Sequence, residues 1–405
     1  MTLVAKPHRA LFLSLFGAFT LFGTSMTIFG AALPKILRDF KWSDGTVGAV
    51  IAAAAAGYVL SSLASSLVLK RLGPKATMLI GLAACVAGLA FFASGPSFVA
   101  NLLLNALIGA GQGLIEPTVS WSAFKMDEEG AGKPMNLMHG AFAVGAVAGP
   151  VALGAIMSRG LAWVILFRVI AGLFALIAVA LAAMPFSLLG STDAAPSQGA
   201  AATKRRGAAF WLGFVCLMLY VGTELGISNW IAEYFVRIFA ANEAIASLTV
   251  SLFWIGLLAG RFGVPALYRG RRQEIVLGTS ALLLAAATMA LCATGFVSRG
   301  GSASLWPPAV FTFMAGLGCS VIYPTVISLV GVACKETQAE AITFAITGGG
   351  VGLFAFPFLM SWISQAFEIR IGFATYALIA ALTAAVCIAL ARVFARERLS
   401  ARGNR

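Results

Sequence analysis

The segment SLLGSTDAAPSQGAAATKRRG occupies residues 187–207 and is the one long polar stretch in an otherwise apolar chain. Its Ala, Ser, Gly and Pro content and its basic end are typical of a flexible linker. On either side of it, apolar runs close to the ~20 residues that cross a bilayer recur along the chain. Because six such runs precede the segment and six follow it, the sequence predicts two halves, residues 1–186 and 208–405, joined by the linker 187–207.

The composition indicates that these runs lie in a membrane. The chain has 405 residues, of which 60% are hydrophobic and only 11% are charged, which is too apolar for a soluble domain. Runs this long and continuous exclude barrel strands, so we expect an all-α membrane protein. We place the twelve helices near residues 10–34, 46–69, 76–94, 98–124, 134–158, 162–186, 208–237, 244–268, 274–296, 306–332, 338–366 and 370–396.

The distribution of positive charge predicts the topology. The formal net charge is +13, but most Lys and Arg residues fall in alternate connections between the expected helices. This asymmetry follows the positive-inside rule and predicts that both termini are cytoplasmic. We therefore expect a multi-pass protein of a bacterial inner membrane, with the lipid bilayer and not nucleic acid as its partner.

Internal similarity supports the division into halves. The tripeptide Pro-Thr-Val at 117–119 recurs at 324–326, which is 207 residues later. GAVAGP at 145–150 aligns with GLFAFP at 352–357 at the same offset. The fourth and fifth expected helices therefore correspond to the tenth and eleventh, as in transporters built from parallel repeats.

Two further segments carry a resemblance to the major facilitator superfamily. The loop after the second helix of each half of that superfamily typically reads GxxxDRxGRR, and SLVLKRLGPK (66–75) and GVPALYRGRR (263–272) are degenerate copies of it, 197 residues apart. Lys70 and Leu267 stand where the family has its acid. The resemblance implies two six-helix bundles with a solute site at the midplane between them.

Four stretches resemble, more narrowly, the branch related to fucose–proton symporters. They are GQGLIEP (111–117), NLMHGAFAVGAVAGP (136–150), YVGTELGISNWIAEYF (220–235) and SLFWIGLLAGR (251–261). The chain departs from the branch after Glu116, where Ser120 and Trp121 occupy a region that often holds an asparagine. The resemblance implies a sugar-like solute.

The fourth expected helix has a polar stripe. Asn105, Gly109, Gln112, Glu116 and Ser120 are spaced three or four residues apart and share one helical face. The stripe is typical of a helix that lines a wet cavity. Alternatively, its polar side chains join neighbouring helices by hydrogen bonds.

The seventh expected helix repeats this pattern with a second acid. Tyr220, Glu224 and Ser228 are spaced by four residues, with Asn229 and Trp230 on neighbouring faces. A carboxylate, an amide and an indole together can hold a sugar, by hydrogen bonds to its hydroxyls and by stacking on its ring. This stretch is predicted to form part of a solute site.

Intramembrane acids are functional candidates because a charge in lipid is costly. Burial favours the neutral carboxyl group, so Glu116 and Glu224 are both candidates to carry a coupling proton. A sodium site would use the same type of oxygen ligand, so sodium coupling stays open. The sequence does not assign the two acids to solute or ion.

Four other residues are candidates with a structural alternative. Arg261 either pairs with an acid across the cavity or extends to the cytoplasmic interface. His139, three residues after Asn136, is either a proton relay or a hydrogen-bonded structural histidine. Tyr323 lies beside the repeat of Pro117, at the position equivalent to Glu116, and either contacts solute or packs.

Several classes of function lack their motifs. The chain has no GxxxxGK[ST] loop for ATP and no cysteine–histidine cluster for a metal, so we expect neither a cofactor nor enzymatic activity. The six cysteines fall in or at the edges of expected helices and predict no disulfide framework.

The favoured hypothesis is a secondary active transporter for a small polar, sugar-like solute, working by alternating access as a single chain and coupled to protons. The alternatives are a sodium-coupled transporter, an exporter of amphipathic compounds by ion antiport, and a transport-inactive solute sensor.

Overall fold

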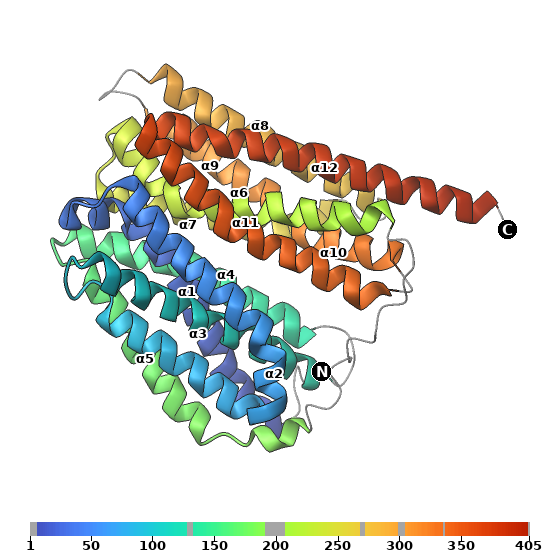
Figure 1. Cartoon of the computed structure of the whole chain (residues 1–405), viewed down its shortest axis with the longest axis horizontal. Coiled ribbons are helices and arrows are strands. Elements are labelled where there is room, and N and C mark those ends of the chain that lie inside the picture. Colours follow the sequence, from blue (N-terminus) through green and yellow to red (C-terminus); the bar gives the residue numbers. More distant parts are fainter. Residues whose placement is uncertain are drawn as a thin grey trace. The chain divides into compact units, whose positions relative to one another are not determined.

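The computed structural model describes residues 6–127, 133–190, 207–267, 272–298, 304–334 and 337–403 (Figure 1). The described part of the chain is helical and contains no strand, so the expected all-α class is confirmed. The helices before the midpoint are α1 (Arg9–Phe40), α2 (Asp44–Phe91), α3 (Phe98–Lys125), α4 (Lys133–Ser158) and α5 (Val164–Ala182). Those after it are α6 (Ala208–Phe239), α7 (Glu243–Leu267), α8 (Gln273–Val297), α9 (Trp306–Cys319), α10 (Ile322–Ala333), α11 (Gln338–Ala366) and α12 (Ile369–Gly403).

Within the described residues, eleven helices are long and apolar enough to cross a membrane, counting α9 and α10 as one. One of them, α2, has 48 residues. A continuous helix of this size is about 70 Å long, which is more than twice the thickness of the hydrocarbon core of a bilayer. Its backbone breaks at Gly73, where φ is 79° and ψ is 167°, just before Pro74. The helices expected at 46–69 and 76–94 are therefore both present, joined by a glycine turn, which gives the twelve crossings of the expected fold.

The chain divides into two compact units, Met1–Ala195 and Pro196–Arg405, which we describe separately. The predicted linker 187–207 falls largely outside the described residues. Its first residues belong to a short 3-10 helix, Phe186–Leu189. A second 3-10 helix, Lys6–His8, precedes α1.

In the first unit, glycines set the closest approaches between helices. A Cβ atom at Gly109 of α3 would overlap the carbonyl oxygen of Ala54 on α2. A Cβ atom at Gly145 of α4 would overlap the carbonyl oxygen of Thr20 on α1. The pairs α2–α3 and α1–α4 are thus in backbone contact, which only glycine permits.

The second unit uses the same device at the positions given by the internal repeat. A Cβ atom at Gly316 of α9 would overlap the carbonyl oxygen of Phe253 on α7, and one at Gly352 of α11 would overlap that of Met218 on α6. Gly316 and Gly352 each lie 207 residues after their counterparts Gly109 and Gly145. The repeat read from the sequence is therefore a repeat of helix packing.

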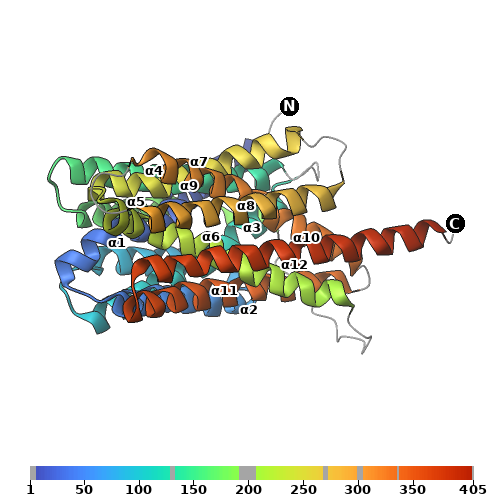
Figure 2. The ribbon, with the colours of Figure 1, turned by 90° about the horizontal axis from the view of Figure 1, so that it is seen from above.

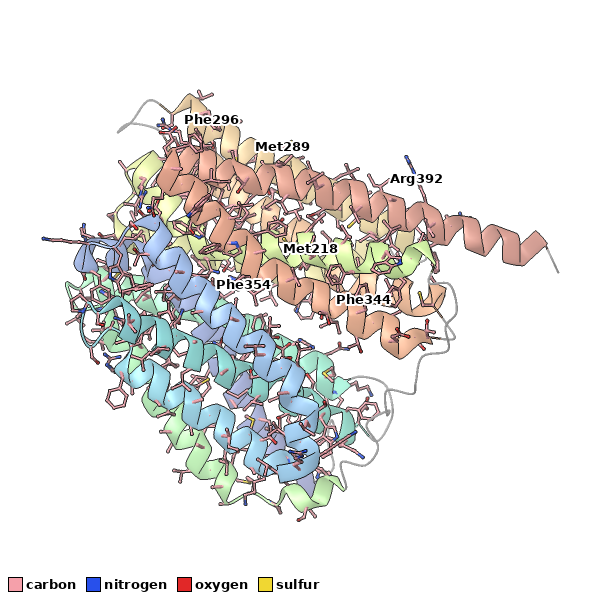
Figure 3. All side chains as sticks on the ribbon, in the orientation of Figure 1. Met218, Met289, Phe296, Phe344, Phe354 and Arg392 are labelled. Carbon is pink, nitrogen blue, oxygen red and sulfur yellow. The ribbon has the colours of Figure 1, made fainter. Side chains whose placement is uncertain are left out.

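Apolar side chains also cover the outside of each unit. Figure 3 shows Met289 and Phe296 on the outer surface of α8, where both are about half exposed. In Figures 1 and 2, α12 extends past the ends of α8 and α11 of its own unit, and its 35 residues exceed the length that a bilayer requires.

Candidate functional site

The polar stripe of α3 faces two neighbouring helices. Asn105 Nδ2 donates a hydrogen bond of 2.9 Å to the carbonyl oxygen of Val50 on α2. Gln112 Nε2 donates one of 2.9 Å to Ser25 Oγ on α1. Both side chains are buried, so these two members of the stripe join helices, as the structural alternative predicted.

Glu116 has a different kind of partner. The hydroxyl group of Tyr58 on α2 donates to Glu116 Oε2 at 2.5 Å, the length of a strong charge-assisted bond. Among the described residues, this phenol is the one partner recorded for Glu116, which is half-buried. The acid therefore has a neutral partner in the middle of the first unit.

Small residues bring Tyr58 to the acid. Gly113 lies three residues before Glu116, and a Cβ atom there would overlap the carbonyl oxygen of Tyr58 and the hydroxyl of Ser61. The resulting close contact of α2 with α3 carries the phenol to the carboxyl group. Sequence reasoning missed Tyr58, although a single phenol within an apolar run is a signal of a buried polar partner.

In the second unit, the helix equivalent to α3 is interrupted. Helix α9 ends at Cys319 and α10 begins at Ile322, two residues before Pro324. The hydroxyl group of Tyr220 on α6 donates to the carbonyl oxygen of Cys319 at 3.1 Å. That oxygen lies at the end of α9, where helix geometry leaves carbonyl groups unpaired, and the phenol satisfies it.

Glu224 lies one turn after Tyr220 and is 9% exposed. Arg261 on α7 is within electrostatic reach of it, and so is Tyr220. No direct ion pair joins Glu224 to Arg261, both of which the structure describes. The Nε atom of Arg261 is buried and has no hydrogen-bond partner. The structure therefore brings a carboxyl group and a guanidinium group near each other, but they form no direct ion pair.

Other predicted residues lie beside this pair on α6 and α10. Ser228 Oγ accepts a hydrogen bond of 2.9 Å from Trp254 Nε1 of α7, and the ring of Tyr323 on α10 lies 6.5 Å from that of Tyr220. Asn229 is half-buried. Trp230 is completely enclosed, with no partner for its Nε1, so its indole offers no free face for stacking on a solute in this structure.

Asn136 and His139 lie near the beginning of α4 and are exposed. The imidazole ring of His139 packs edge-on against Phe19 of α1, with ring centroids 6.0 Å apart. This contact is a packing interaction between two helices, which is typical of a histidine with a structural role.

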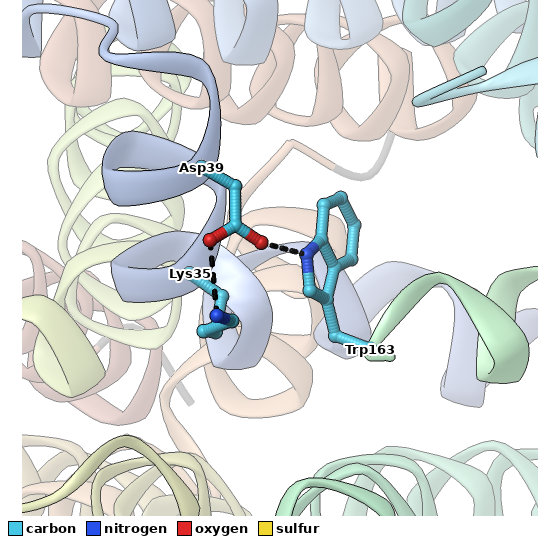
Figure 4. A network of polar contacts seen from close by, with 3 residues as sticks. All are labelled: Lys35, Asp39 and Trp163. Carbon is cyan, nitrogen blue, oxygen red and sulfur yellow. Dashed lines mark hydrogen bonds and ion pairs between the residues drawn. The ribbon is translucent and has the colours of Figure 1, made fainter. Parts of the chain in front are cut away.

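A polar network joins the C-terminal part of α1 to the residue that precedes α5. Lys35 Nζ and Asp39 Oδ1 of α1 are 2.9 Å apart, and Trp163 Nε1, just before α5, donates to Asp39 Oδ2 at 2.9 Å (Figure 4). Nearby, Arg168 Nη1 donates to the carbonyl oxygen of Leu89 at 2.6 Å. Sequence reasoning singled out neither Asp39 nor Arg168, and both hold helix ends together.

Comparisons with known proteins agree with this architecture. The family model described as Major Facilitator Superfamily matches residues 15–305. The glucose/mannose transporter GlcP of Bacillus subtilis (strain 168) is 20% identical over 388 residues, which cover 92% of each chain.

Two solved structures share the fold. A bacterial homologue of the human lysosomal transporter Spinster, in an inward-facing conformation, superposes with a TM-score of 0.75 at 16% identity, covering 97% of this chain and 98% of that one. The E. coli fucose:proton symporter FucP has a TM-score of 0.63 at 19% identity, covering 96% and 99%. The resemblance to the major facilitator superfamily that was inferred from the sequence motifs is confirmed.

A family match over more than half of the chain, eleven membrane-length helices among the described residues, one of them divided at Gly73, and a glycine-packed internal repeat lead to one conclusion: the chain belongs to the major facilitator superfamily, a family of multi-pass membrane transporters for small molecules.

Proposed function

We propose that the chain is a secondary active transporter that moves a small, neutral, sugar-like solute and couples this movement to protons through Glu116. The names of two relatives support the solute class, since GlcP is a glucose/mannose transporter and FucP a fucose:proton symporter. The observation that carries the coupling assignment is the bond between Glu116 and Tyr58.

The partner chemistry separates the two acids. Among the described residues, the one partner recorded for Glu116 is a neutral phenol, so its ionised form has no cation paired with it. Glu224, by contrast, has a cationic side chain, Arg261, within electrostatic reach. Glu116 is therefore the stronger candidate for a group that is protonated on one side of the membrane and releases its proton on the other.

Glu224 and Arg261 of the second unit, which form no direct ion pair, can both form hydrogen bonds with a hydroxylated solute. A hydroxyl group both donates and accepts, so it can accept from Arg261 Nε and donate to Glu224. A buried N–H group without a partner is costly, and a solute that satisfies it gains that energy. Tyr323 and Asn229 are further candidates for solute contact.

In this proposal the predicted halves, 1–186 and 208–405, are the two bundles of an alternating-access cycle joined by the linker 187–207. Both termini face the cytoplasm of a bacterial cell, the protein lies in the inner membrane, and a single chain is the working unit.

Uptake into proteoliposomes tests the proposal. Wild type, Glu116→Gln and Glu224→Gln would be compared across neutral sugars, with an inward proton gradient, an inward sodium gradient or neither. We expect wild type to accumulate one sugar only with the proton gradient. Glu116→Gln should exchange that sugar without accumulating it, and Glu224→Gln should bind it more weakly.

Glu368→Gln is a matched control, because Glu368 is exposed between α11 and α12. It should behave as wild type. Accumulation of no sugar under either gradient would overturn the proposal, and accumulation with sodium alone would overturn its coupling ion.

A further inference from the structure

Two buried thiols of the second unit face each other. Cys216 on α6 and Cys387 on α12 are both 0% exposed, and their sulfur atoms are 3.1 Å apart, although 171 residues separate them in the sequence. The contact brings together helices at opposite ends of this unit's sequence.

The other buried cysteines have different surroundings. Cys85 Sγ donates to the carbonyl oxygen of Ile108 at 3.7 Å, and Cys292 Sγ donates to that of Phe373 at 3.8 Å. Among the described residues, Cys216 and Cys387 form the one recorded thiol–thiol contact. No disulfide bond joins Cys216 to Cys387 in this structure.

The geometry points to a modification site: we propose that Cys216 and Cys387 form an intramolecular disulfide bond when the protein meets a small two-electron oxidant of the peroxide class. A disulfide bond is about 2.05 Å long, so the two sulfur atoms need to approach by about 1 Å. Rotation about side-chain bonds and a small relative shift of α6 and α12 supply this movement.

The chemistry balances with hydrogen peroxide alone. One thiol is oxidised to a sulfenic acid and one water molecule is released. The second thiol then attacks that sulfur, the sulfur–sulfur bond forms and a second water molecule leaves. Two thiols are oxidised, one peroxide is reduced to two water molecules, and no other reactant is needed.

Burial determines which oxidant is suitable. Thiols in apolar surroundings react slowly, and both sulfur atoms are closed to solvent. A small uncharged oxidant such as hydrogen peroxide can enter where a large charged disulfide cannot. In a reducing cytoplasm the pair stays as thiols, so the bond would mark oxidative conditions.

The bond would act on the helix that carries the second acid. Tyr220 and Glu224 lie one and two turns after Cys216 on α6. Joining Cys216 to α12 would fix this part of α6 against a second helix of the same unit. The inference does not depend on the solute or on proton coupling, because it concerns a bond that can be measured without transport.

Mass spectrometry on the full chain in lipid nanodiscs tests the site. After treatment with hydrogen peroxide and unfolding, we expect two fewer cysteines to react with an alkylating reagent. A linked peptide pair that contains Cys216 and Cys387 should appear, and dithiothreitol should remove it. Cys216→Ser and Cys387→Ser should each abolish the pair, whereas Cys292→Ser should retain it and serve as the matched control.

Three results would overturn the proposal. The first is that all six thiols stay reactive after oxidation. The second is that oxidation links other cysteines, such as the half-buried Cys334, or links two chains. The third is that Cys216 and Cys387 gain oxygen atoms without forming a linked peptide.

Discussion

Replacing Glu116 by glutamine should reduce the proton-driven accumulation of solute to none, and the size of the loss follows from the number of acids that titrate. The structure gives one acid with a neutral partner, Glu116 beside Tyr58, and a second acid with a cation in reach, Glu224 beside Arg261. If only Glu116 carries a proton, each transported neutral solute moves with one proton. One pH unit across the membrane then supports about a tenfold concentration ratio of solute at equilibrium.

The assay is the steady-state ratio of solute inside and outside proteoliposomes, with the membrane potential clamped at zero and the imposed pH difference varied. Wild type should show a slope of one decade of solute ratio per pH unit. Glu116→Gln should show a slope of zero and keep solute exchange at equal pH. A slope near two decades, or a slope that falls in Glu224→Gln while it persists in Glu116→Gln, would refute the assignment.

Three further predictions concern single contacts. Tyr58→Phe removes the hydroxyl group that donates to Glu116, so the pH profile of uptake should shift while the coupling ratio is unchanged; a profile that stays in place would contradict this role. Arg261→Lys keeps the charge but loses the guanidinium donors, so the KM for the solute should rise roughly tenfold or more while the accumulation slope stays the same; an unchanged KM would remove Arg261 from the solute site. Gly145→Ala should lower the stability by about 1–3 kcal/mol in thermal unfolding, because the added Cβ overlaps the carbonyl oxygen of Thr20, whereas Gly140→Ala in the same helix, where the Cβ meets no atom within 4 Å, should not; equal effects of the two substitutions would contradict the backbone contact of α1 with α4.

The fold could be predicted because its signals are local or strictly repeated. Apolar run length depends on the bilayer alone, and the offset of 207 residues carries Gly109 onto Gly316 and Gly145 onto Gly352. Continuity differs from the expectation at two places in the described residues: the helix expected at 306–332 is divided into α9 and α10, and α2 is continuous through Gly73. A glycine with positive φ followed by proline turns the chain without a loop, so two expected helices adjoin within α2.

The candidate site could be predicted only in part, because periodicity places residues on a face of one helix and does not identify the helix opposite. The spacing of Asn105, Gln112 and Glu116 gave one stripe, but the partners of its three members lie on α1 and α2. Tyr58 could not be paired with an acid 58 residues away by any local pattern. In the same way, nothing in the order of residues on α6 indicated that Trp254 would reach Ser228.

The repeat also explains why the two units differ in chemistry while they share their packing. Leu257 follows Gly256 on α7 as Tyr58 follows Gly57 on α2, and both glycines meet backbone carbonyl groups of the neighbouring helix. Tyr323 takes the place of Glu116 before the repeated proline. The second unit thus lacks both members of the acid–phenol pair at the equivalent positions.

Helix packing allows the residue type to change at some equivalent positions of the two units and not at others. A Cβ atom at the contact glycines would collide with backbone, so those positions admit only glycine in either unit. A polar side chain on an adjacent face can be exchanged without moving a helix, provided that its partner changes as well. The first unit has Glu116 and Tyr58 at these positions, and the second unit has Tyr323 and Leu257 at the equivalent ones. Since Tyr323 carries a phenol where Glu116 carries a carboxyl group, the repeat places an acid at this position in one unit only, and the proposed coupling ratio of one proton per solute rests on that asymmetry.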